Sequence, residues 1–501
     1  MPKPSLTIQT AMPSIAPNNK DHLVLLTVHH PKQPALTPVR QKLNIAFAID
    51  VSGSMSGCLQ GVWKEVPVAP LETALHRGGL QPHPRPVFIG SPYIGTPPIG
   101  TPHVGTPLQP WDPNVVPMTP SPSAPGLPGL PLQPQGPVPN IFPVPTTKRV
   151  GVSKLDRVKQ AVSEALDVLQ PDDRFSIVVF DSQARVIQTS TLATASAKER
   201  AKALLQELHP GSSTALHAGW SLAAQSVAQA LASDTVNRVL LLTDGEATDG
   251  ITDATTLAQN TAHMASHGIS TSTFGVGDHF NEDLLQAMAE SGDGRYVYLE
   301  TAEQYGTVFQ AEFQGLSRAY GRAATLRGLT FVECEVDFLN DLPVQNGAWK
   351  LPNPQYDKEE HFLLKITPKN KAEPFNVDIT YTYTTAQGDI SVSIQHHVGV
   401  VSDKTYGQYK VNDTVAKKQL ELDTARAKAK AMQALDQGDL VRSRSILAAS
   451  ANAIVGSAYA EEFSSTTARL DTLMSTQDTT KLRKMATYDA YSTRTGDSSG
   501  S

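Results

Sequence analysis

The amino-acid sequence predicts an α/β domain with a doubly wound, mainly parallel sheet, inserted into a β-sandwich and followed by a C-terminal helical bundle. Three observations lead to this prediction. Apolar strands alternate with amphipathic helices between residues 43 and 320. Segments that alternate like half-buried antiparallel strands lie both before and after that region. The last part of the chain, from about residue 412, has only helical periodicity.

The α/β region begins with LNIAFAID at residues 43–50, a continuous apolar run of the kind that is buried on both faces of a parallel sheet. A helix is expected after Ser153, which is a good N-cap, because Leu155, Val158 and Val162 fall on one helical face. Further strands are expected at FSIVVF, ARVIQT, NRVLLLTD, ISTSTFGVG and RYVYLE. Helices are expected at SAKERAKALLQELH, TALHAGWSLAAQSVAQAL, ATTLAQNTAHMASHG and EDLLQAMAESG.

The β-like segments SLTIQT and HLVLLTVHH precede this region, and they are too few to form a stable sheet by themselves. We therefore expect them to share one sandwich with the β-like segments that follow the α/β region. The expected organisation is sandwich strands in 1–40, an α/β domain in 41–56 and 151–320, an insertion in 57–150, further sandwich strands in 321–405, a helical region in 410–490 and a disordered tail in 491–501.

The insertion has a composition unlike the rest of the chain. It holds 23 of the 37 prolines, and a five-residue repeat, IGSPY-IGTPP-IGTPH-VGTPL, runs from Ile89 to Leu108. Proline removes backbone donors, so no helix or central strand is expected there. Two interpretations stay open, an exposed surface insertion and a docking segment for a partner, with self-association as one form of docking.

Composition excludes some classes of protein. The net charge is −6 and no basic stripe is present, which argues against a nucleic-acid partner. No apolar stretch reaches the roughly 18–20 residues that a membrane span needs. The beginning of the sequence lacks the apolar core of a signal peptide, and Cys58 and Cys334 are far apart. We therefore expect a cytoplasmic protein.

Polar residues follow two of the predicted buried strands and precede one helix. Asp50 ends the first strand and is followed by Ser52 and Ser54 on a loop that Gly53 allows to curl. Thr214 lies at a loop–helix junction, and Asp244 ends NRVLLLTD. Ligands bind beyond the carboxyl ends of parallel strands, so these side chains are expected to meet there. Two carboxylates and three hydroxyls suit Mg²⁺, or else Mn²⁺ or Ca²⁺, and do not suit zinc or copper.

DVSGS at residues 50–54, with Thr214 and TDG at residues 243–245, resembles the metal-ion-dependent adhesion site of von Willebrand factor A domains, whose pattern is D-x-S-x-S…T…D. The resemblance covers residues 43–318 apart from the insertion. It implies that the two serines and Thr214 bind the ion directly. It also implies that the two aspartates bind it directly or through water, and that an acidic residue of a protein partner completes the coordination.

The flanking segments resemble a bacterial subset of this family that is related to inter-α-trypsin-inhibitor heavy chains and calcium-activated chloride channel homologues. The resemblance implies a non-enzymatic protein-interaction module, acting as a scaffold or adaptor. Two alternatives stay open: an assembly partner of an AAA+ ATPase or a kinase–phosphatase system, and a metal-dependent hydrolase. The insertion departs from the family pattern. Both ends of the insertion must return to the edge of the sheet where the metal ligands are expected. There the insertion could cover the site, supply a ligand from Glu65, Glu72 or Asp112, or extend the binding surface.

Overall fold

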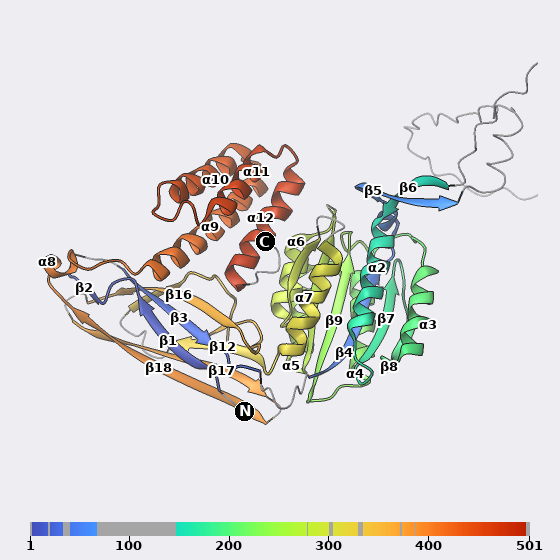
Figure 1. The fold of residues 1–501 in the computed structure, drawn as a ribbon, viewed down its shortest axis with the longest axis horizontal. Coiled ribbons are helices and arrows are strands. Elements are labelled where there is room, and N and C mark those ends of the chain that lie inside the picture. The colour runs from blue at the N-terminus through green and yellow to red at the C-terminus, as the bar shows by residue number, and fades with distance from the viewer. Residues whose placement is uncertain are drawn as a thin grey trace, which may run out of the picture. The chain divides into compact units, whose positions relative to one another are not determined.

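The fold is seen in a computed structural model (Figure 1). It describes residues 3–18, 21–33, 41–67, 147–277, 279–299, 304–328, 334–370, 373–385 and 387–496, with the backbone alone for 58–67, 147–150, 304 and 305. One compact unit comprises Met1–Trp63 and Gly151–Ser501, and the second comprises Lys64–Val150. The proline repeat, Glu72 and Asp112 lie outside the described residues, as does the side chain of Glu65.

The α/β region forms the six-stranded sheet that the sequence predicts. Its strand order is β11-β10-β9-β4-β7-β8, and all neighbouring strands are parallel except β7 and β8. The apolar first strand therefore lies in the middle of the sheet, between two parallel neighbours. The strands are β4 (Lys42–Asp50), β7 (Arg174–Phe180), β8 (Ala184–Leu192), β9 (Thr235–Thr243), β10 (Ile269–Val276) and β11 (Tyr296–Leu299).

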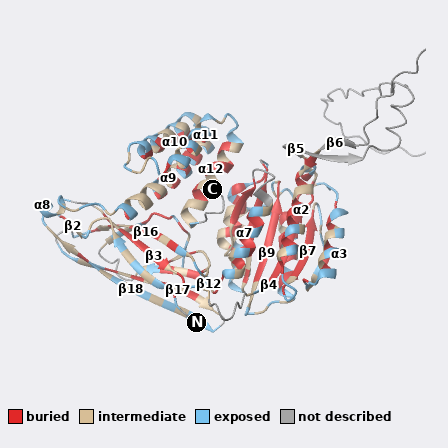
Figure 2. Cartoon of the chain, viewed as in Figure 1, coloured by how far each residue is buried: buried red, intermediate tan, exposed pale blue. Residues whose placement is uncertain are grey.

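Helices cover both faces of this sheet (Figure 1). Alternate residues of β4 point to opposite faces: Phe47 and Ile49 join one apolar cluster, and Ala46 and Ala48 join the other. The first cluster includes side chains of α2 (Lys154–Val168), α3 (Ala195–Gln206) and α7 (Gln304–Arg318). The second includes side chains of α4 (Leu216–Ala228), α5 (Ala254–Ser266) and α6 (Glu282–Ser291). Figure 2 shows the buried strands between exposed helix faces.

The β-sandwich is assembled from both sides of the α/β domain, as predicted. N-terminal β3 pairs with β16, and N-terminal β2 pairs with β18. One sheet has the order β1-β3-β16-β13 and the other β14-β15-β12-β17-β18-β2. The strands are β1 (Ser5–Thr10), β2 (Ser14–Ile15), β3 (His22–His29), β12 (Arg322–Gly328), β13 (Cys334–Phe338), β14 (Val344–Gln345), β15 (Ala348–Lys350), β16 (Glu359–Pro368), β17 (Phe375–Thr385) and β18 (Gly388–Val400). Apolar residues of both sheets form one core between them.

The C-terminal region is helical, and it packs on the α/β domain. Its helices are α8 (Asp403–Tyr406), α9 (Asp413–Asp436), α10 (Leu440–Val455), α11 (Ser464–Ser475) and α12 (Thr479–Thr495). Apolar side chains of α10, α11, α12 and the second half of α9 belong to the same cluster as those of α4, α5 and α6. Arg483 and Lys484 of α12 both form ion pairs with Glu282, at the start of α6.

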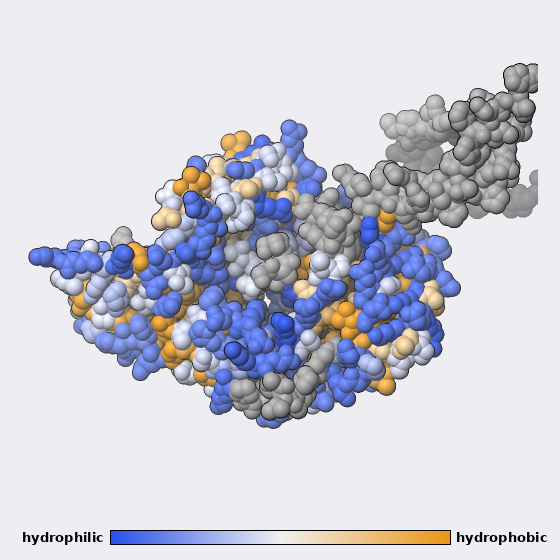
Figure 3. All heavy atoms as spheres, viewed as in Figure 1, coloured by the Kyte–Doolittle hydropathy of each residue, from blue (hydrophilic) through white to orange (hydrophobic). Residues whose placement is uncertain are grey.

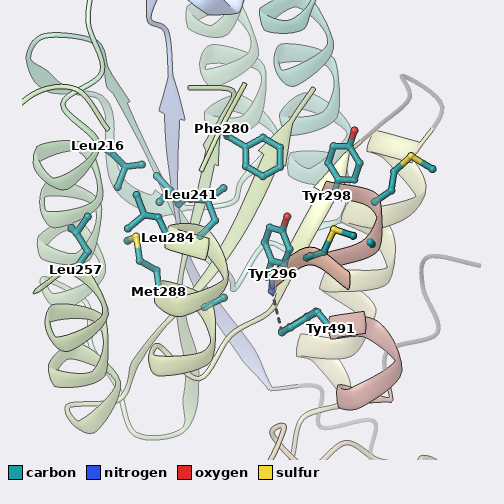
Figure 4. Close-up of a cluster of buried hydrophobic side chains, with 14 of the residues drawn as sticks. Leu216, Leu241, Leu257, Phe280, Leu284, Met288, Tyr296, Tyr298 and Tyr491 are labelled. Carbon is teal, nitrogen blue, oxygen red and sulfur yellow. Dashed lines mark hydrogen bonds between the residues drawn. The ribbon is translucent and has the colours of Figure 1, made fainter. Parts of the chain in front are cut away.

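The predicted disordered tail was placed too early. Residues 491–495 are the last turn of α12, and Tyr491 is 2% exposed. The Tyr491 hydroxyl accepts a hydrogen bond of 3.1 Å from the backbone N–H of Tyr296, an interaction drawn in Figure 4. Gly496, in the left-handed conformation, ends the helix. Residues 497–501 lie outside the described part of the chain.

The ends of the insertion form a two-stranded sheet of β5 (Cys58–Pro67) and β6 (Thr147–Ser153). The two segments that flank this sheet lie side by side, because the N–H of Lys154 donates to the carbonyl of Gly57 at 2.9 Å. None of the helices in the described ranges is both long and apolar enough to span a bilayer. The face seen in Figure 3 is mostly hydrophilic, with apolar residues in small groups.

Candidate metal centre

Three loops at the carboxyl edge of the sheet hold the five predicted site residues. Asp50 is the last residue of β4, and Ser52 and Ser54 follow it in a turn that includes the short 3₁₀ helix Gly53–Ser56. Asp244 directly follows β9, the neighbour of β4. Thr214 comes two residues before the start of α4. The parallel pairing of β4 and β9 thus places both carboxylates at the same edge, as predicted.

Hydrogen bonds connect four of these residues in series, from Asp50 through Ser52 and Ser54 to Asp244. Asp50 Oδ1 accepts from the backbone N–H of Ser52 at 2.8 Å. The hydroxyls of Ser52 and Ser54 lie 3.0 Å apart, and Ser54 donates to Asp244 Oδ1 at 2.7 Å. Asp50 Oδ2 accepts from the hydroxyl of Thr243, which the sequence analysis had given no role. The two carboxylates are therefore joined through the backbone N–H of Ser52 and the hydroxyl groups of Ser52 and Ser54.

The fifth residue, Thr214, meets the others around Gly245. A Cβ placed on Gly245 would lie 3.3 Å from Thr214 Oγ1, 3.4 Å from Ser54 Oγ and 3.9 Å from Asp50 Oδ2. Oxygen atoms of the serine turn and of the Thr214 loop thus converge on the space beside Gly245, a residue of the third loop. The structure brings all five predicted residues together. Their role as metal ligands stays a prediction.

Backbone hydrogen bonds hold the loops against one another. Gly53 N–H donates to the carbonyl of Ser212 at 2.9 Å, which ties the serine turn to the Thr214 loop. Thr214 N–H donates to the hydroxyl of Thr248 at 3.0 Å, and Thr248 N–H donates back to the carbonyl of Thr214 at 3.0 Å. These contacts tie the Thr214 loop to the Asp244 loop. The hydroxyl and carboxyl groups are therefore positioned by the scaffold itself.

Burial dominates the electrostatics of Asp50, whose exposed fraction is 0%. Burial raises the pKa of Asp50 to about 6, although hydrogen bonds from Thr243 and Ser52 act to lower it, and the nearby charge of Asp244 raises it further. A buried carboxylate of this kind favours a bound cation, because a positive charge offsets the cost of its ionised form.

Lys154 also reaches the site and was not predicted from the sequence. Its ammonium group lies 2.7 Å from Asp244 Oδ2, on the carboxylate oxygen that Ser54 does not contact. The lysine is 8% exposed and is the first residue of α2. A sequence signal existed, because a cation at the first position of a helix is disfavoured by the helix dipole unless an anion lies nearby.

The donor atoms fit a hard divalent cation. All five predicted side chains offer oxygen, and the space beside Gly245 is kept open by the absence of a Cβ. Ser54 is exposed, whereas Asp50, Ser52, Thr214 and Asp244 are buried, so the site is reached from solvent at Ser54. Within the described ranges, no group of three or more His, Cys, Asp or Glu residues forms an alternative metal cluster.

Comparison with known families identifies the α/β region. The model of the von Willebrand factor type A domain matches residues 142–311. The chain contains a von Willebrand factor A domain. The match begins after most of the insertion and omits β4 with its D-x-S-x-S turn, yet the structure places that strand at the centre of the sheet.

Curated relatives support the assignment to the von Willebrand factor A family. An uncharacterized protein of Synechocystis sp., sll0103, is 32% identical over 164 residues, which is 32% of this chain and 38% of that protein. The uncharacterized Escherichia coli protein YfbK is 28% identical over 162 residues, 32% of this chain and 28% of that protein. Inter-alpha-trypsin inhibitor heavy chain H1 of Bos taurus is 24% identical over 163 residues, 31% of this chain and 18% of that protein. The matched region thus spans well under half of each relative.

Solved structures extend the likeness of fold beyond the von Willebrand factor A domain. A von Willebrand factor type A protein from Catenulispora acidiphila has a TM-score of 0.61 and 14% identity, covering 98% of this chain and 96% of that chain. The ArnB paralog VWA2 from Sulfolobus acidocaldarius has a TM-score of 0.53 and 11% identity, covering 99% of each chain. The arrangement of sandwich, α/β domain and helices therefore has counterparts with very different sequences.

Proposed function

We propose that this chain is a divalent-metal-dependent protein-interaction module, a cytoplasmic scaffold or adaptor. In this proposal Asp50, Ser52, Ser54, Thr214 and Asp244 hold Mg²⁺, and an acidic residue of a protein partner completes the coordination. Von Willebrand factor A domains are a family of metal-dependent interaction modules, which supports the general class.

One observation carries the proposal. Thr214 Oγ1, Ser54 Oγ and Asp50 Oδ2 converge on the space beside Gly245, and Ser54 connects that space to solvent. Because three of the five side chains are neutral hydroxyls, a divalent cation held there keeps charge to share with an incoming carboxylate. When bound, the ion supplies a Lewis-acidic position for that carboxylate. The chain's own residues hold the oxygen atoms in position.

Metal binding is tested with a substitution that removes one hydroxyl and little volume. Thr214→Val is expected to weaken Mg²⁺ binding at least tenfold in isothermal titration calorimetry of the full chain. The matched control is Thr261→Val, since Thr261 is also buried and its hydroxyl donates to a carbonyl of its own helix. Equal Mg²⁺ affinities for Thr214→Val and the unaltered chain would refute this ligand set.

The partner is tested by affinity capture from a lysate with Mg²⁺ and again with EDTA, followed by mass spectrometry. We expect at least one protein that is retained with Mg²⁺ and lost both in EDTA and with Asp50→Ala. That protein should lose its binding when one of its exposed acidic residues is replaced by the corresponding amide. Partners that bind equally well in EDTA would contradict a metal-dependent module.

A further inference from the structure

The ammonium group of Lys154 lies beside the proposed metal ligands, and the proposed function gives it no role. We propose that Lys154 is a built-in counter-cation that weakens metal binding and, once the metal is bound, strengthens the capture of the partner's carboxylate. The proposal rests on the proposed function, because it concerns the regulation of the same site.

The geometry allows the lysine and a metal ion to share Asp244. Asp244 Oδ1 accepts from Ser54 and therefore faces the hydroxyl groups of the site. Asp244 Oδ2 accepts from Lys154 at the same distance, 2.7 Å. The side chains of Asp244 and Lys154 are 0% and 10% exposed. A cation at the Oδ1 side does not require the ammonium group to leave Oδ2, so Lys154 acts through Asp244 as a positioning residue.

Lys154 is also fixed in place by its surroundings. Its backbone N–H donates to Gly57, and the preceding Ser153 caps α2. Its Cε and Nζ lie 2.9 and 3.2 Å from the position of a Cβ on Gly277, a residue with a φ of +68°. A side chain at residue 277 would require the end of the lysine side chain to shift, and the positive φ itself favours glycine there. The glycine at residue 277 thus leaves room for the lysine side chain that reaches Asp244.

The charges decide the direction of the effect. With both carboxylates ionised, Asp50, Asp244 and Lys154 sum to −1, and a divalent ion brings the total to +1. Without the lysine the same totals are −2 and 0. Lys154 thus repels the incoming metal ion, and it leaves the loaded site with a positive charge that attracts a carboxylate.

The test measures metal and carboxylate binding separately in the full chain. We expect Lys154→Met to bind Mg²⁺ at least tenfold more tightly in calorimetry. In the Mn²⁺-loaded protein, water-proton relaxation is expected to show acetate binding severalfold more weakly than in the unaltered protein. Loss of a merely structural contact would loosen the metal, so tighter binding separates the two roles. Lys154→Gln keeps a donor to Asp244 without the charge, and we expect the same two changes in binding for it. If Lys154→Met does not fold, Lys154→Gln alone decides the test.

The matched control is Lys159→Met, because Lys159 is a second buried lysine of α2 whose ammonium donates instead to the carbonyl of Leu208 at 2.6 Å. Its Mg²⁺ affinity is expected to equal that of the unaltered chain. The inference is wrong, and the proposed function stands, if the unaltered chain binds Mg²⁺ as tightly as both Lys154 variants do. The same holds if acetate binds the Mn²⁺-loaded unaltered chain and the Mn²⁺-loaded variants with equal affinity. If neither the unaltered chain nor the variants bind Mg²⁺, both are wrong.

Discussion

Gly245 offers a direct test of whether the oxygen-lined space is a binding site. An alanine methyl there would lie 3.3 Å from Thr214 Oγ1 and 3.4 Å from Ser54 Oγ, within the space on which the oxygens converge. Gly245 is not among the residues with positive φ, so alanine suits its backbone. Since no contact is shorter than 3.3 Å, Gly245→Ala is expected to change the free energy of unfolding by no more than about 1 kcal/mol.

Metal binding should respond far more strongly than stability. We expect Gly245→Ala to weaken Mg²⁺ binding at least tenfold, or about 1.4 kcal/mol, because the methyl group takes the place of the ion or of its water. Calorimetry with Mg²⁺ and urea denaturation without it measure the two effects. Gly315→Ala is the control, since its methyl would lie 3.3 Å from a polar atom of Gln355, away from the carboxyl edge. Unchanged Mg²⁺ affinity in a folded Gly245→Ala protein would refute the reasoning.

Three further predictions concern stability. Arg238→Met should lower the free energy of unfolding in urea by about 1–3 kcal/mol, because the buried Glu312 loses its 2.8 Å partner and keeps Arg295 at 3.1 Å, and no measurable change would contradict this. Tyr491→Ala should lower the free energy of unfolding in urea by about 3–5 kcal/mol, and Tyr491→Phe should lower it much less, because phenylalanine keeps the buried ring. Equal effects of the two substitutions would show that the ring does not hold α12 to the sheet. Burial lowers the pKa of His22 to about 4, with His396 as a second cause, so the unfolded chain binds a proton on His22 more readily than the folded one does. Stability should therefore fall by up to about 3 kcal/mol as the pH drops from 6.5 towards 4, and urea denaturation over that range should show this slope reduced in His22→Leu.

The site was predictable because its residues follow strongly patterned elements. Asp50 and Asp244 end continuous apolar strands, and parallel strands bring their carboxyl ends to one edge. Lys154 was not predicted, because its distance from Asp244 depends on how the chain closes across the insertion. The backbone hydrogen bond between Lys154 and Gly57 sets that closure. The position of a lysine at the start of a helix indicates a nearby anion, but it does not say which one.

The end of the chain was misjudged for a different reason. The polar sequence STRTGDSSGS at residues 492–501 led to a predicted tail over 491–501, although Leu482, Met485, Ala486, Ala490 and Tyr491 continue one apolar helical face. The glycine at residue 496 is also a typical helix terminator. That face packs against residues around Tyr296, which lie in another domain. The sequence of the tail alone does not show that this surface exists, so it could not predict that the helix continues.

The pairing of β3 with β16 has a consequence for how the polypeptide is made. Leu25 and Leu363 are register partners, so a ribosome must finish the whole α/β domain before β3, which already has β1 on one side, acquires its second neighbour. Until then Val24, Leu26 and Val28, all 0% exposed in the finished protein, have no sandwich core to enter. Nascent chains that end between the α/β domain and β16 should therefore bind holdase chaperones through this strand, although their α/β domain is already complete.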